Sequence, residues 1–227
     1  MRSILFCALL VAGSAGGADP AFRSYKFLEE MTSPEVRAAV ASGTTTILVP
    51  IGGTEQNGDH IALGKHNVRA KALAAAIAAR LGNALVAPVV SYVPEGSISP
   101  PSGHMRLPGT ITVPEEAFER MLETAAKSFI SHGFTAVVLL GDHGGYRRSL
   151  EKVRARVNSR ASRPVLIVPE EYYREMEHAG TEDTALTLAI DPSLVRDPRG
   201  ASVEKGREAR DQIVERTVAA IRRAASK

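Results

Sequence analysis

Histidine and carboxylate side chains gather in three loops of this 227-residue chain, over residues 52–67, 141–146 and 177–184. These loops, with the segment just before residue 105, contain five of the six histidines: His60, His66, His104, His143 and His178. They also contain the acidic residues Glu55, Asp59, Asp142, Glu177, Glu182 and Asp183. Imidazole and carboxylate groups from separate loops form the usual ligand sets of zinc and manganese. The residue types therefore favour a divalent-metal site with an open position for catalysis.

Other catalytic chemistries have weaker support in the sequence. It contains no G-x-S-x-G motif of the serine hydrolases. It also lacks G-x-x-x-x-G-K-[ST], and no G-x-G-x-x-G follows an expected strand. The glycine pair Gly144 and Gly145 is compatible with a tight turn or with a backbone cradle for an anion.

Apolar runs, punctuated by glycine and proline, predict alternating strands and helices. Strands are expected at residues 45–50, 84–90, 136–140 and 164–168. Helices are expected at residues 67–81, from 114 to near 133, at 148–159 and at 207–225. This alternation is typical of an α/β fold whose mainly parallel sheet is covered on both faces. Because such folds bind ligands at the carboxyl ends of their strands, we expect the post-strand loops to converge.

Composition excludes several classes of partner. Aromatic residues make up 5% of the chain, tryptophan is absent and the net charge is +3, which does not favour nucleic-acid binding. No apolar run approaches the ~20 residues that a membrane-spanning helix needs. We predict one domain over residues 19–227 whose partner is a small molecule.

Residues 1–18 have the pattern of a secretory signal peptide. Arg2 is followed by an apolar stretch over residues 4–12 and by small residues before Asp19. Cleavage would remove Cys7, the only cysteine, so the mature protein could not form a cysteine-based structural zinc site. We predict an exported protein, periplasmic or secreted, with no membrane attachment after cleavage. A buried N-terminal strand or helix is the alternative.

Four motifs, in this order along the chain, resemble those of the creatininase family (creatinine amidohydrolase and its relatives). They cover residues 50–66, 104–110, 141–146 and 177–184, and the last three read HMRLPGT, GDHGGY and EHAGTEDT. The first motif contains P-I-G-G-T-E-Q and ends in L-G-K-H. The resemblance implies a three-layer α/β/α sandwich with a mainly parallel sheet, and a homo-oligomer.

The resemblance implies a binuclear metal site, but two ligand positions differ in this chain. Asn57 stands at a histidine position, and His66 stands where an aspartate would bridge two metals. An imidazole cannot bridge two ions as a carboxylate does. We therefore expect one divalent ion, zinc or manganese, rather than two. The metal-ligand candidates are Glu55, Asn57, His66, His143 and Asp183, while Asp142 or Glu182 could also rebuild a second site.

The activity implied by the resemblance is hydrolysis of a small amide C–N bond, in some members cyclic, by metal-activated water. Glu177 or His178 is expected to protonate the leaving nitrogen. The expected substrate contacts are His104, Gly144, Gly145 and Tyr146. Two alternatives stay open. One is an exported small-molecule binding protein with a degenerate, non-catalytic metal site, and the other is metal-dependent hydrolysis of a lactone or phosphoester.

Overall fold

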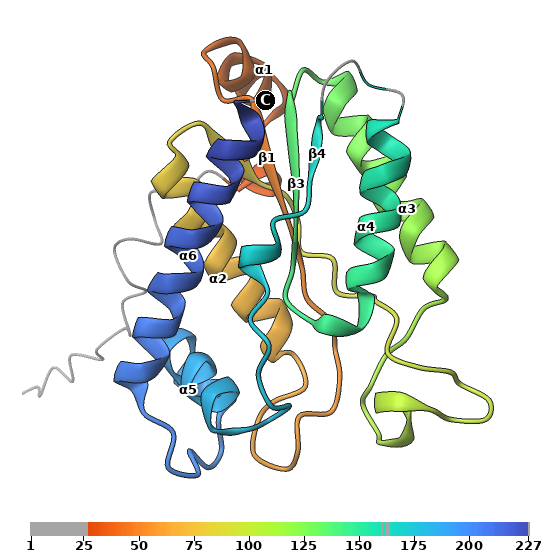
Figure 1. Cartoon of the computed structure of the whole chain (residues 1–227), viewed down its shortest axis with the longest axis vertical. Coiled ribbons are helices and arrows are strands. Elements are labelled where there is room, and N and C mark those ends of the chain that lie inside the picture. The colour runs from red at the N-terminus through yellow and green to blue at the C-terminus, as the bar shows by residue number, and fades with distance from the viewer. Residues whose placement is uncertain (1–26, 160, 162–163, 227) are drawn as a thin grey trace, which may run out of the picture.

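The structure, a computed structural model, describes residues 27–159, 161 and 164–226, so the predicted signal peptide lies outside the described residues. Parallel strands form a sheet in the order β2-β1-β3-β4, of which β1, β3 and β4 are labelled in Figure 1. They are β1 (Thr46–Ile51), β2 (Ala84–Val86), β3 (Ala136–Gly141) and β4 (Leu166–Ile167). Every residue of β1 and β3 is buried, as expected for parallel strands that are covered on both faces.

Helices cover both faces of the sheet (Figure 1). One face carries α2 (Lys65–Leu81), α5 (Thr181–Ile190) and α6 (Val203–Ala225). The other carries α1 (Ser33–Ala41), α3 (Glu115–Ser131) and α4 (Arg147–Asn158). Leu48 and Val138 belong to the first core and Ile47 and Val137 to the second, because successive side chains of a strand point to opposite faces. The predicted three-layer α/β/α arrangement is confirmed.

Some element boundaries differ from the prediction. Helix α2 begins at Lys65, two residues before the expected start, and this places His66 in its first turn. The strands predicted at 84–90 and 164–168 are shorter in the structure, and α1 was not predicted. Helix α5 was also not predicted and begins at Thr181, inside the third of the His- and carboxylate-bearing loops. In the part of the chain that the structure describes, no helix combines the length and hydropathy that crossing a membrane would require.

The chain leaves β1 through two glycines that pack closely against the start of α2. A Cβ added at Gly52 would lie 2.3 Å from Asn67 Oδ1. Gly53, with a φ of 143°, donates its N–H to the same oxygen at 2.9 Å. This close approach, which glycine permits, brings the following residue Glu55 next to the first turn of α2.

Candidate metal centre

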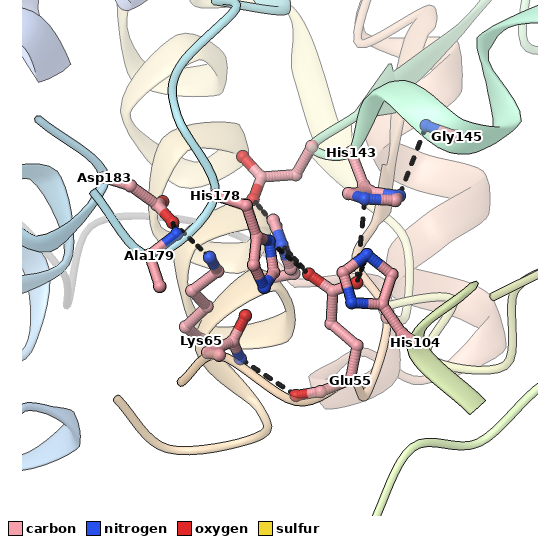
Figure 2. Close-up of polar contacts among 12 residues, drawn as sticks. Glu55, Lys65, His104, His143, Gly145, His178, Ala179 and Asp183 are labelled. Atoms are coloured by element: carbon pink, nitrogen blue, oxygen red, sulfur yellow. Dashed lines mark hydrogen bonds and ion pairs between the residues drawn. The ribbon is translucent and has the colours of Figure 1, made fainter. Parts of the chain in front are cut away.

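Glu55 lies at the centre of the site, where the loops after β1 and β3, the first turn of α2 and the segment before α5 meet (Figure 2). Glu55 Oε1 lies 2.8 Å from His66 Nε2 and 3.6 Å from His178 Nδ1. Glu55 Oε2 faces His104 Nε2 at 3.2 Å and His143 Nε2 at 3.6 Å. The predicted convergence of the post-strand loops is confirmed.

Glu95 completes a set of donors that could hold a metal ion. Glu55, Glu95, His104 and His143, hereafter the metal group, each offer one ligand atom, and these atoms lie within 4.8 Å of one another. Both Glu95 carboxylate oxygens and Glu55 Oε2 are buried and have no hydrogen-bond partner among the described residues. Because leaving such oxygens unsatisfied is costly, a divalent cation would stabilise all three. Two carboxylates and two imidazoles fit zinc or manganese.

The pKa values of Glu55, Glu95 and His143 are shifted from their ordinary values. Burial and the adjacent Glu55 carboxylate raise the pKa of Glu95 to about 9. Burial also acts to raise the pKa of Glu55, but the hydrogen bond and the charge of His66 outweigh it and lower this pKa to about 2. Burial lowers the pKa of His143 to about 4, so its imidazole is neutral at pH 7 and has one lone pair, for which a metal would compete with the Gly145 N–H.

Two buried cations, Lys65 and Arg69, lie beside the metal group. Arg69 Nε is 2.7 Å from Asp142 Oδ2, and Arg69 Nη1 is 2.5 Å from Asp183 Oδ1. Lys65 Nζ pairs with Asp183 Oδ2 (Figure 2), and His66 Nδ1 lies 2.7 Å from Asp142 Oδ2. We call these five residues the cation network. None of their side chains is more than 6% exposed.

Within the cation network, Asp142 and Asp183 balance the charges of Lys65 and Arg69. Burial acts to raise the pKa of Asp183, but the charges of Arg69 and Lys65 outweigh it and hold this pKa well below its usual range. Burial lowers the pKa of Lys65, and the neighbouring Asp183 opposes that effect. Two aspartates therefore compensate two cations that the start of a helix would otherwise disfavour.

His178 stands on the wall of a cavity of about 310 Å³ that also reaches His104, which was predicted to contact substrate. His178 Nε2 donates to the Gln56 carbonyl oxygen at 2.9 Å. A carbonyl can only accept, so the His178 proton is on Nε2 and its Nδ1 keeps a lone pair on the Glu55 side. Burial lowers the pKa of His178, which favours the neutral, basic form. Glu177, the other predicted acid, is exposed.

Three of the predicted metal ligands interact with protein groups in the structure. Asn57 donates its amide to the Glu55 carbonyl at 3.0 Å, and its buried Oδ1 lacks a hydrogen-bond partner within the described chain. Both ring nitrogens of His66 lie within 2.8 Å of a carboxylate, and Asp183 belongs to the cation network. Their role as ligands stays a prediction. Glu55 and His143 are the predicted ligands that also belong to the metal group.

Of the predicted substrate contacts that follow β3, the two glycines line the cavity and the tyrosine is buried. Gly144 and Gly145 line the cavity, although the Gly145 N–H donates to His143 Nδ1 at 3.3 Å. Tyr146 is buried, and its hydroxyl donates to the Ile51 carbonyl oxygen at 2.8 Å. Tyr146 therefore ties the end of β1 to the loop after β3, and its predicted substrate contact stays untested.

The roles of Glu95, Lys65 and Arg69 were not predicted from the sequence. Glu95 follows β2 in a segment rich in proline and glycine, where a single acid does not stand out. Lys65 and Arg69 are four residues apart at the start of α2, whose first turn has no acidic residue. Because cations near a helix N-terminus oppose the helix dipole, this arrangement was the available signal that acidic partners lie nearby.

Comparison with known proteins gives consistent matches. A family model described as creatininase (creatinine amidohydrolase) matches residues 29–199. The chain is 30% identical over 154 residues to a mycofactocin precursor peptide peptidase of Mycolicibacterium smegmatis, covering 66% of this chain and 59% of that protein. It is 26% identical to a creatinine amidohydrolase of Pseudomonas putida, covering 76% of this chain and 60% of that protein. The chain therefore spans about 60% of the length of these two relatives.

Solved structures share the fold at lower identity. A structure described as "Creatininase Mn" has a TM-score of 0.73 and 22% identity, covering 88% of this chain and 98% of that one. A mutant creatininase described as "Zn-Zn type" has a TM-score of 0.73 and 23% identity, covering 87% of this chain and 97% of that one. At this identity the likeness shows the fold alone.

Proposed function

Because this chain belongs to the creatininase family, we propose that it is a metal-dependent hydrolase that cleaves the C–N bond of a small amide. The single observation that carries the proposal is the metal group, in which two buried carboxylates and two imidazoles meet beside a cavity. Two relatives support the type of bond, since one is named as a peptidase and the other as an amidohydrolase. The cavity volume of about 310 Å³ fits one small molecule.

The metal group would hold the ion, because its unsatisfied carboxylate oxygens and the neutral His143 imidazole suit a divalent cation. When bound, such an ion supplies Lewis-acid chemistry, which makes water a stronger acid and withdraws charge from an amide carbonyl. Zinc and manganese both fit the donor types.

His178 is the residue best placed to move protons. Its Nδ1 lone pair lies on the Glu55 side of the site, and the Gln56 carbonyl fixes the proton on Nε2. In the proposed reaction, Nδ1 takes a proton from the attacking water and returns it to the leaving nitrogen, since an amide anion leaves very poorly. Glu177 is not among the residues that line the cavity, and it is the second candidate for this role.

A non-catalytic binding protein is the second candidate function. Asn57 and His66, which stand at two ligand positions of the family pattern, both engage protein groups in this structure. A site that has lost its catalytic ion would still offer a polar cavity to a small molecule.

We also propose that the protein is exported, because residues 1–18 have the composition of a signal peptide. A homo-oligomer, which the resemblance to the family implies, is a further prediction. Light scattering of the purified protein measures its mass in solution and tests this point.

The proposed activity is tested with protein that starts at Asp19. A panel of a cyclic amide, a formamide, a dipeptide, a lactone and a phosphoester is assayed before and after treatment with a chelator. Amide cleavage that the chelator abolishes and added zinc or manganese restores is the expected result. Cleavage of the lactone or the phosphoester without cleavage of any amide would contradict the proposed reaction and favour ester hydrolysis. Tight binding of a panel member without turnover would favour the non-catalytic binding protein.

A further inference from the structure

We propose that this chain binds a single divalent cation in the metal group, and that two buried protein cations, Lys65 and Arg69, exclude a second. The inference rests on the proposed function only in requiring that a metal binds. Two observations support it. The first is the difference in charge between the metal group and the cation network, which lie on opposite sides of Glu55. The second is the set of hydrogen bonds made by the carboxylates that could serve as ligands.

With both of its carboxylates ionised, the metal group would have two negative charges, and it lacks a compensating cation of its own. Glu55 and Glu95 are both fully buried at the side chain, and three of their four oxygens have no hydrogen-bond partner among the described residues. The other two members, His104 and His143, are imidazoles whose nearest carboxylate is Glu55. One divalent cation would neutralise this side and satisfy the three oxygens.

The cation network already has its full complement of positive charge. Arg69 and Lys65 stand against Asp142 and Asp183, giving two charges of each sign. Asp183 uses both oxygens. Arg69 holds Oδ1. Lys65 and the Ala179 N–H hold Oδ2 (Figure 2). Both oxygens of Asp183 and Oδ2 of Asp142 are therefore already held by protein cations.

Glu55 separates the two sides because its oxygens face different neighbours. Oε2 belongs to the metal group, whereas Oε1 is held by His66 Nε2 at 2.8 Å. His66 in turn contacts Asp142 through Nδ1, and Arg69 Nη2 lies 3.0 Å from the same ring nitrogen. A second ion would have to displace His66 and lie close to a buried guanidinium, where repulsion between like charges is weakly screened.

Metal counting tests the inference directly. Wild-type protein is stripped with a chelator, titrated with zinc by calorimetry and, after removal of free ion, analysed by elemental mass spectrometry. We expect one zinc per chain, and anomalous diffraction at the zinc edge should place one peak between Glu55 and Glu95. Glu95→Gln should weaken zinc binding at least tenfold. The matched control is Glu119→Gln, which removes a buried carboxylate whose partners, Lys152 and Arg156, do not belong to the metal group.

A second variant probes the exclusion by Lys65 and Arg69. In Lys65→Met/Arg69→Met, the freed carboxylates of Asp142 and Asp183 should accept a second zinc and raise the count toward two. Circular dichroism in excess zinc reports whether this variant folds. If the variant does not fold, the number of zinc ions per wild-type chain and the zinc affinity of Glu95→Gln still test the inference.

Each outcome separates the inference from the proposed function. Two zinc ions in the wild type, or one ion whose affinity Glu95→Gln leaves unchanged, would overturn the inference. Hydrolysis that remains sensitive to the chelator in those cases would leave the proposed function standing. A wild-type chain that binds no zinc or manganese would overturn both.

Discussion

Glu95→Gln should change how the stability of the metal-free protein depends on pH. The Glu95 carboxyl has an ordinary pKa of 4.5, which burial and the neighbouring Glu55 raise in the folded protein. Above pH 4.5 the folded state therefore keeps a proton that the unfolded state has released. The contribution of this proton to the free energy of unfolding is fully present below pH 4.5 and is lost as the pH rises toward the pKa of Glu95 in the folded state. Glutamine resembles the protonated carboxyl and does not titrate, so the variant lacks this loss.

The size of the effect follows from proton linkage. One proton of difference between the states costs about 1.4 kcal/mol per pH unit. Between pH 5.5 and 7.5 the variant should therefore gain up to about 2.7 kcal/mol relative to the wild type. For a domain of this size, that corresponds to a relative rise in Tm of about 5–11 °C.

The assay is urea denaturation in a chelator at pH 5.5, 6.5 and 7.5. Glu119→Gln serves as the control, because its ion pairs with Lys152 and Arg156 hold the pKa of Glu119 below its ordinary value despite burial. Its removal should lower stability by a nearly constant amount over this pH range. Wild-type and Glu95→Gln stabilities that run parallel from pH 5.5 to 7.5 would refute the reasoning.

Three further predictions concern proton transfer, the cation network and the signal peptide. His178→Asn should keep its metal and lower kcat by about 10²–10⁴-fold, measured beside Glu177→Gln, and a larger loss in Glu177→Gln would transfer the proton-moving role to that residue. Asp183→Asn should destabilise the protein by about 3–5 kcal/mol in urea denaturation, because it leaves the buried Lys65 unpaired; the exposed Asp211→Asn is the control, and equal losses would contradict this account. Protein recovered from the exported fraction should begin near Asp19 by N-terminal sequencing, and an intact Met1 would contradict the signal peptide.

The parallel sheet could be predicted because its strands coincide with short apolar runs in the sequence. The six residues of β1 and the six of β3 are buried on both faces, so each reads as continuous hydrophobic sequence. β4 is harder to delimit, since only Leu166 and Ile167 pair within a longer apolar run. Helix α5 was missed because it begins within a polar motif, although it is largely buried after Thr181.

The candidate site was only partly predictable from the sequence. Glu55 and His143 could be found because each lies directly after a strand in a recognisable motif. Glu95 could not, because its importance arises from burial beside Glu55, forty residues earlier, and no spacing encodes that contact. The same holds for Arg69, whose partners Asp142 and Asp183 come from two distant segments.

Titration of zinc or manganese into the stripped enzyme, with amide hydrolysis followed in the same samples, tests the central claim most directly. We predict no hydrolysis in the stripped protein, and a rate that rises linearly with added metal and levels off at one equivalent per chain. Hydrolysis at the full rate in the stripped protein, confirmed free of metal by elemental analysis, would contradict the account.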